Sequence, residues 1–199
     1  MRIGNKLITA KTEKEIMEKN GGQQVFQKSH GDLYVDGSCR WPTDAAAARA
    51  SWAAVQINTE GNILAAAQGT IGADFRQAAV EGEQHAVLFG MGAAEQGVTL
   101  QCDCASVLRH ARQPYKQAAG PRRRFAGYRR ERATATQSRG LKHGLSKVKA
   151  HRTKQAIAAM GAEEAHHTAG NSTVDGLAKE ACGWHQTAVD TRNAVAKAT

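Results

Sequence analysis

Four acidic residues stand in local sequences that suit metal-ion chemistry. Asp36 and Asp103 each close a short apolar run that is typical of a β-strand, and Glu83 and Asp175 lie in segments with helical spacing. Carboxylate oxygens are the ligands that hard divalent cations such as Mg²⁺ prefer. A cluster of these four side chains could therefore bind metal ions and support phosphodiester hydrolysis.

Glu83 is the most informative of the four. Apolar residues recur at helical spacing in its segment, and Glu83 occupies a position on that stripe where an apolar residue is expected. A buried carboxylate costs several kcal/mol unless it is paired or bound to a cation. Glu81 is the competing candidate, but it lies off the stripe, so we expect Glu83 to be the ligand. The stripe consists of Ala79, Val80, Ala86, Val87, Gly90, Met91 and Ala94.

Hydrophobic periodicity predicts the elements that must position these carboxylates. The expected order is three strands, a helix, a strand, a helix, a strand and a last helix. Pro114, Gly120, Pro121 and Gly127 argue against one long helix between the fourth and fifth strands. The expected strands are 33–36, 51–58, 63–69, 98–103 and 146–150, and the expected helices are 76–95, 105–112 and one N-capped by Asn171.

Five segments, in chain order, resemble motifs of the ribonuclease H family. The resemblance runs from about Asp32 to about Ala181 and implies an α/β fold, a five-stranded mixed sheet with helices on both faces. We expect this domain at 31–185, between a flexible arm at 1–30 and a tail at 186–199. The five segments are Tyr34-Val35-Asp36-Gly37-Ser38, Glu83-Gln84-His85-Ala86-Val87-Leu88, Leu100-Gln101-Cys102-Asp103-Cys104, Val148-Lys149-Ala150-His151 and the run from Gly170 through Asp175 to Lys179.

The resemblance also implies roles for the site residues. Asp36 would bridge two Mg²⁺ ions, for which Mn²⁺ can substitute. Glu83 and Asp103 would hold the ion near the leaving group, and Asp175 the ion near the attacking water. His151 would move a proton or help product leave, and His167, in the His166-His167 pair, is the rival histidine.

A separate signal is the uneven distribution of positive charge. The chain carries a net charge of +9, and 12 of its 27 Lys and Arg residues lie between Arg112 and Lys149, where the single acidic residue is Glu131. Taken alone, such a block is typical of a solvated loop or a nuclear-localisation stretch. Inserted between nuclease-like motifs, it favours contact with phosphates. The expected nucleic-acid-binding residues are Ser38, Arg122, Arg123, Arg124, Arg129 and Arg130, with Phe125 and Tyr128 as flat apolar faces among them.

Composition narrows the class of protein further. The 199 residues suit one domain, and no apolar run approaches the roughly 18 residues of a membrane span. No signal-peptide apolar region is found near the N-terminus, so we expect a soluble intracellular protein, either cytoplasmic or nuclear, and a monomer. The four cysteines show no CxxC spacing, which argues against zinc and favours reduced thiols.

These observations predict a Mg²⁺-dependent endonuclease that cuts the RNA strand of RNA/DNA hybrids. Two alternatives stay open: a catalytically inactive module that only binds nucleic acid, and a DNA-cleaving nuclease of the same fold, such as a resolvase or transposase. The polar residues that often precede the helix glutamate in the family are replaced by Ala78, Ala79 and Val80, and the interval from His151 to Asp175 is long. Together with the basic insert, these departures are more similar to a retroelement domain than to a housekeeping enzyme.

Overall fold

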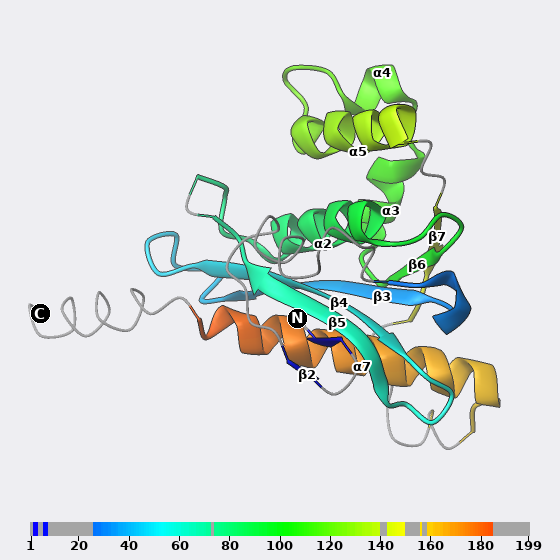
Figure 1. Cartoon of the computed structure of the whole chain (residues 1–199). Coiled ribbons are helices and arrows are strands. Elements are labelled where there is room, and N and C mark those ends of the chain that lie inside the picture. The colour runs from blue at the N-terminus through cyan, green and yellow to red at the C-terminus, as the bar shows by residue number, and fades with distance from the viewer. Residues whose placement is uncertain are drawn as a thin grey trace, which may run out of the picture.

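A twisted mixed sheet organises the domain. The computed structural model describes residues 2–3, 6–7, 26–72, 74–139, 143–149, 156 and 159–184. Five strands form the centre of the sheet in the order β5-β4-β3-β6-β7, and two short strands extend it beyond β5 (Figure 1). The strands are β1 (Arg2–Ile3), β2 (Lys6–Leu7), β3 (Leu33–Arg40), β4 (Arg49–Ile57), β5 (Ile63–Thr70), β6 (Thr99–Cys102) and β7 (Gly144–Lys147).

The direction of the strands follows from their connections. Short turns join β3, β4 and β5 into an antiparallel meander, whereas β6 and β7 pair in parallel with β3 and with each other. Parallel neighbours need long crossovers, which the helical segments 79–93 and 105–139 provide. The expected five-stranded mixed sheet is therefore confirmed.

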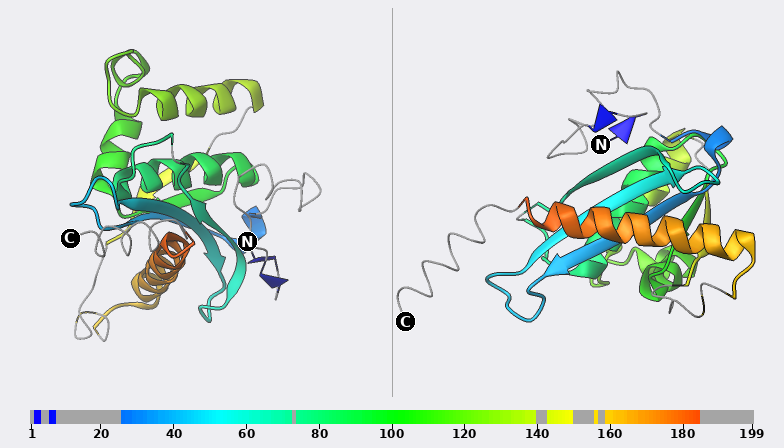
Figure 2. Two further views of the ribbon diagram at one scale, coloured as in Figure 1. Left: turned by 90° about the vertical axis from the view of Figure 1, so that its left-hand side faces the viewer. Right: turned by 90° about the horizontal axis from the view of Figure 1, so that it is seen from below.

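Helices cover both faces of the sheet, as expected. Helix α2 (Ala79–Ala93) lies on one face and α7 (Ala162–Cys182) on the other (Figure 2). Trp52 and Phe89 are central to the core under α2, with ring centroids 4.4 Å apart. Tyr34 and Val174 pack in the second core, under α7. Within the described residues, no helix is long and apolar enough to cross a membrane.

Two glycines allow α2 to approach the sheet at backbone distance. Gly37 of β3 lies against Gly82 and Glu83 of α2, and a methyl group on Gly37 would lie 2.6 Å from the Ala79 carbonyl oxygen and closer still to the backbone of Gly82 and Glu83. A methyl group on Gly82 would clash in turn with the Ser51 carbonyl group of β4. No side chain fits between this strand pair and the helix.

The packed structure begins before β3. Phe26 is fully buried, meets the ring of Phe89 edge-on at 6.3 Å and bridges to Ala94 at the end of α2. The buried Gln56 side chain holds the next segment, accepting from the Gln27 backbone N–H and donating to the Gln27 and Gly31 carbonyls. The short helix η1 (Lys28–His30) follows. Packing thus reaches five residues ahead of the expected domain start at residue 31.

The basic block between Arg112 and Lys149 is not one long helix, as expected. It begins at the last residue of α3 (Ala105–Arg112) and contains α4 (Tyr115–Ala118), α5 (Ala126–Arg139) and strand β7. Helix α5 packs on α2 through the buried residues Tyr128 and Arg132. One nitrogen of Arg132 contacts both the side-chain oxygen of Gln84 and Nδ1 of His110, each at 3.1 Å. The described part of the block is therefore anchored to the domain and is not a solvated loop.

The start of α7 differs from the prediction. The helix begins at Ala162 after Gly161, and Glu163 and Glu164 in its first turn suit the positive end of the helix dipole. Asn171, expected as the N-cap, lies near the middle of the helix and is buried. An asparagine is tolerated there because its side chain bonds a group on the sheet and does not compete with the helix backbone.

The close approach of β3 and α2 can be tested by adding one methyl group. We expect Gly37→Ala to lower the free energy of unfolding by about 2 to 3 kcal/mol, because the methyl group meets backbone that cannot move independently. Urea unfolding measures the change. Gly176→Ala in α7 is the matched control, since its methyl group meets nothing within 4 Å and should stabilise the helix by up to about 1 kcal/mol. Equal effects of the two substitutions would contradict the packing described above.

Candidate metal centre

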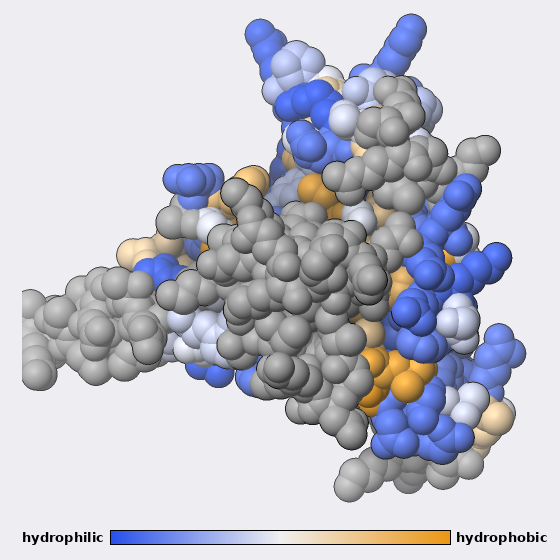
Figure 3. Space-filling view, viewed as in Figure 1, coloured by the Kyte–Doolittle hydropathy of each residue, from blue (hydrophilic) through white to orange (hydrophobic). Residues whose placement is uncertain are grey.

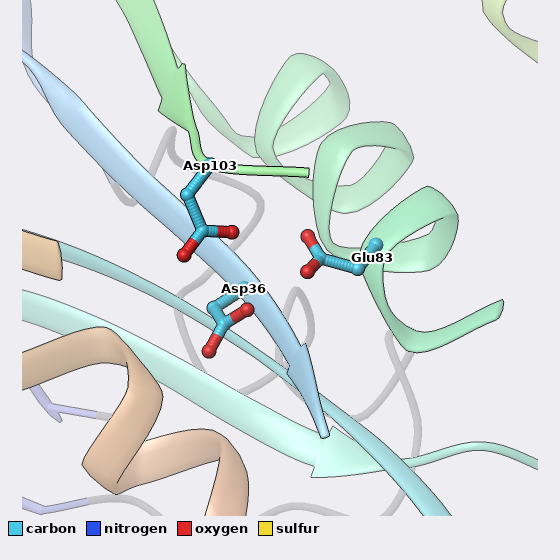
Figure 4. A group of neighbouring side chains, drawn as sticks. All are labelled: Asp36, Glu83 and Asp103. Carbon is cyan, nitrogen blue, oxygen red and sulfur yellow. The ribbon is translucent and has the colours of Figure 1, made fainter. Parts of the chain in front are cut away.

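Three carboxylates from three different elements face one another. Asp36 lies on β3, Glu83 on α2 and Asp103 directly after β6, and one oxygen of each lies within 4.8 Å of the others. Figure 4 shows the three groups pointing into a common space. Asp36 and Glu83 are buried at 6% exposure each, and Asp103 is half-buried. This arrangement brings together three of the four carboxylates predicted from the sequence.

The fold explains why these residues meet. Parallel strands β3 and β6 are in register from Leu33–Leu100 to Val35–Cys102, so Asp36 and Asp103 follow at the same level. Strand β6 ends at Cys102, which frees Asp103 from the ladder. The backbone contact between Gly37 and α2 then brings Glu83 alongside Asp36.

Burial and mutual repulsion hold protons on this cluster in the absence of a cation. Burial, together with the negative charges of Asp103 and Asp175, raises the pKa of Asp36 to about 6. Burial and the adjacent Asp36 raise the pKa of Glu83 well above its ordinary value. Of the three carboxyl groups, Glu83 thus has a pKa that burial and the neighbouring Asp36 both raise.

The surroundings of the cluster offer hydrogen bonds, and Lys179 acts on Asp36 through its charge without forming an ion pair with it. Asp36 accepts from the Gly37 backbone N–H at 2.8 Å, Asp103 accepts from Nδ2 of Asn171 at 3.2 Å, and Glu83 accepts from the Cys102 thiol at 3.6 Å. Among the described residues, no Lys or Arg forms an ion pair with any of the three carboxylates. Buried carboxylate oxygens that lack a cationic partner fit a hard divalent ion such as Mg²⁺.

Asp175 lies near the cluster but outside the group of three. Its charge acts on Asp36, so the two side chains are close, yet its Oδ2 atom forms an ion pair with Nζ of Lys179 at 2.6 Å. Lys179 is four residues further along α7, which places both side chains on one face of the helix. The ligand role expected for Asp175 stays a prediction.

The two candidate histidines have different standing. His151 lies outside the described residues. His167 lies on α7, where its Nδ1 atom is 3.0 Å from the hydroxyl group of the buried Tyr34 and its Nε2 atom is 4.0 Å from Glu163. His167 is thus hydrogen-bonded to the core, and which of the two histidines carries protons stays a prediction.

Glu81 lies outside the cluster, as expected. It is nevertheless buried, although its position off the apolar stripe predicts an exposed side chain. It is 8% exposed, and its pKa is raised by burial, an effect opposed by the nearby positive charges of Arg124 and Arg76. The physical reason is that α2 is buried on two sides: the sheet covers one side, and α5, with Tyr128, covers the other.

The expected nucleic-acid-binding residues divide into two groups. Arg122, Arg123 and Arg124 are exposed between α4 and α5, and hydrophilic side chains project from this end of the molecule at the top of Figure 3. Arg129 and Arg130 instead donate to the carbonyls of Gln113 and Ala119 and so hold α5 in place.

Ser38 and the two aromatic residues expected at this surface lie in different surroundings. The guanidinium of Arg124 lies 4.5 Å from the centre of the Phe125 ring. Ser38 is half-buried on β3, two residues after Asp36 and on the same face of the strand. The prediction of Tyr128 as a free aromatic face is wrong, because its ring packs between His85 and Phe75.

Sequence reasoning missed Asn171 as a neighbour of the cluster. Its amide donates to Asp103, and its Oδ1 atom is buried with no hydrogen-bond partner within the described structure. The spacing of four residues between Asn171 and Asp175 would place both on one helix face, but only if the helix starts well before Asn171. The signal was therefore present, and the misplaced helix start concealed it.

The fold has solved relatives, although no family model matches the chain and no curated protein matches its sequence. The protease–reverse transcriptase of prototype foamy virus matches with a TM-score of 0.57 and 19% identity over 77% of this chain and 21% of that one. The solution structure of the PFV RNase H domain matches with a TM-score of 0.55 and 16% identity over 82% and 97% of the two chains. A foamy viral protease–reverse transcriptase in complex with an RNA/DNA hybrid matches with a TM-score of 0.53 and 12% identity over 92% and 22%.

These likenesses, at low identity, define the fold. The chain has an RNase H-like fold, with a mixed sheet and helices on both faces. It spans about a fifth of the length of the foamy virus protease–reverse transcriptase.

The raised pKa values predict how the stability of the metal-free protein depends on pH. A carboxyl group whose pKa is higher in the folded than in the unfolded state binds more protons when folded, so its stabilising contribution is lost as pH rises through the folded pKa. For Asp36 this loss occurs between about 4 and about 6, and for Glu83 it extends higher. In EDTA we expect the free energy of unfolding to fall by roughly 1 to 3 kcal/mol between pH 5 and 8 through this pair.

The substitution Glu83→Gln removes one ionisable group and so isolates its contribution to the pH dependence of stability. The variant should unfold at a higher temperature than the wild type at pH 8 in EDTA, and the difference should shrink toward pH 5. Added Mg²⁺ should raise the melting temperature of the wild type more than that of the variant. Parallel pH profiles of the two proteins would contradict the coupled pair.

Proposed function

We propose that the chain is a divalent-metal-dependent nuclease that hydrolyses the RNA strand of RNA/DNA hybrids. The observation that carries the proposal is the trio Asp36, Glu83 and Asp103, in which Asp36 and Glu83 are buried and no carboxylate forms an ion pair with a Lys or Arg of the described residues. Asp36 on β3 and Asp103 just after β6 lie side by side on adjacent parallel strands of an RNase H-like sheet, and Glu83 faces them from α2. A binding module without chemistry has no need for a carboxylate cluster that destabilises the metal-free fold.

The chain's residues fit two hard cations, with Mg²⁺ as the expected ion. Asp36, Glu83 and Asp103 would hold one ion, and Asp36 with Asp175 the other. Bound Mg²⁺ would activate the attacking water and neutralise charge on the phosphate and the leaving oxygen. Asn171 orients the Asp103 carboxylate from α7, so the protein sets the direction of this ligand before an ion arrives.

The substrate class is supported by charge and by the solved relatives. The exposed side chains of Arg122, Arg123 and Arg124 lie in the segment just before α5, which packs on α2, the helix that carries Glu83. Positive side chains that are held in fixed positions on the surface suit a duplex that is bound through its backbone and shape. A foamy viral protein with this fold is solved with an RNA/DNA hybrid, which favours the same substrate here.

Loss of one ligand tests the proposal. Asp36→Asn should lower Mg²⁺-dependent cleavage of a labelled RNA/DNA hybrid by roughly 100-fold or more, since changes even in the outer shell of metal sites cost about 10- to 100-fold. Binding of the hybrid in EDTA should persist. Asp74→Asn, at an exposed position outside the cluster, is the matched control. Cleavage of duplex DNA in preference to the hybrid would favour the DNA-cleaving alternative, and wild-type turnover by Asp36→Asn would exclude this site.

The role of His151 leads to a second kinetic test. If His151 carries protons, His151→Ala should lower kcat by a factor within about 10² to 10⁴ with little change in hybrid binding. His167→Ala is the comparison, and it should mainly lower thermal stability because it removes the partner of the Tyr34 hydroxyl group. A larger loss of kcat in His167→Ala than in His151→Ala would reverse the assignment.

A further inference from the structure

A basic groove lies next to the segment that carries Asp103. It lies between α3 and β7 and has a volume of about 480 Å³. Arg109 and Arg112 of α3 and Lys147 of β7 contribute its charged side chains, and no acidic residue lines it. The remaining lining residues are Ala105, Leu108, Gln113 and Pro114.

The three cations of the groove are not used to hold the fold together. All three residues are exposed, and within the described residues none of their side chains forms a hydrogen bond or an ion pair. Arg132, Arg129 and Arg130, by contrast, each donate to groups of the protein. Three unpaired positive charges around one open hollow, without a structural role, favour an external anion.

The walls of the groove start at the metal centre. Helix α3 begins two residues after Asp103, and Lys147 pairs across the ladder with Cys102, the residue before Asp103. Along α3, the lining residues Ala105, Leu108, Arg109 and Arg112 recur at helical spacing and share one face. A strand whose phosphate lies at the acidic cluster can therefore continue into the groove without leaving the surface.

A second hollow, of about 170 Å³, lies beyond Lys147, and its charged lining residues are Lys147, Lys149 and Glu164. Glu164 lies 3.8 Å from Lys149, so a carboxylate faces one of these two cations. The groove along α3 differs, because no acidic residue lines it. The path without an acidic lining residue therefore runs from Asp103 along α3.

We propose that the groove formed by Arg109, Arg112 and Lys147 binds the phosphodiester backbone of the same strand that the metal centre holds, on one side of the cut. This proposal rests on the proposed function and adds a binding subsite to it, separate from the exposed arginines between α4 and α5. The subsite would contribute affinity and direction, since its cations contact phosphates and not base edges.

The test compares two variants that remove the same amount of charge. Arg109→Ala/Arg112→Ala removes two cations from the groove, and Lys28→Ala/Arg40→Ala removes two exposed cations elsewhere. Binding of a labelled RNA/DNA hybrid is measured in EDTA over a range of salt concentrations. Each phosphate contact contributes about 0.7 to 0.9 to the slope of log affinity against log salt. We expect the groove variant to lose about 1.4 to 1.8 of that slope, and the control to lose much less.

Cleavage assays then locate the effect. With Mg²⁺, the groove variant should raise KM for a long hybrid and have little effect on KM for a hybrid too short to reach past α3. Equal slopes for the two double variants, or equal changes in KM for both hybrids, would overturn the proposal. Because binding in EDTA needs no catalysis, a chain that binds hybrid through the groove but never cuts it would contradict the proposed function alone.

Discussion

The contact of Gly37 with Gly82 and Glu83 is the constraint on which the site depends. Strand and helix touch there through their backbones, and a carboxylate on the helix is thereby forced beside a carboxylate on the strand. The core packing of Trp52 and Phe89 keeps α2 in this place, so energy gained by burial offsets the repulsion of the acidic pair. The fold therefore holds carboxyl groups together that would repel one another if they were free to move apart.

Local sequence was sufficient to predict the strands and the members of the trio. The apolar run before Asp103 ends because β6 stops at Cys102, whereas β3 continues past Asp36 to Arg40. Glu83 interrupts an apolar stripe because that stripe faces the sheet. Each signal depends only on the period of an element and on the position at which it stops. The order of strands and helices followed from periodicity, whereas the mixed five-stranded sheet was an expectation from the resemblance of the motifs to the ribonuclease H family.

Features that depend on contacts between distant segments were not predictable. The burial of Glu81 needs α5, which packs on α2 from nearly 50 residues further along the chain. Asn171 was interpreted as a cap because a single sequence does not show that its side chain reaches Asp103. From the sequence alone Phe26 belongs to a polar N-terminal segment, because its partner Phe89 lies far along the chain. In each case a tertiary contact overrides a local preference.

The attachment of α5 to the rest of the domain depends on pH. Arg132 is held by the side-chain oxygen of Gln84 and by the lone pair on Nδ1 of His110, and neither partner carries a negative charge. Burial and the positive charge of Arg132 lower the pKa of His110, which keeps the imidazole neutral and able to accept. Protonation of that ring would set two positive charges against each other at the base of α5. The neutral imidazole of His110 therefore helps to hold α5 on the domain, and acidification weakens this attachment.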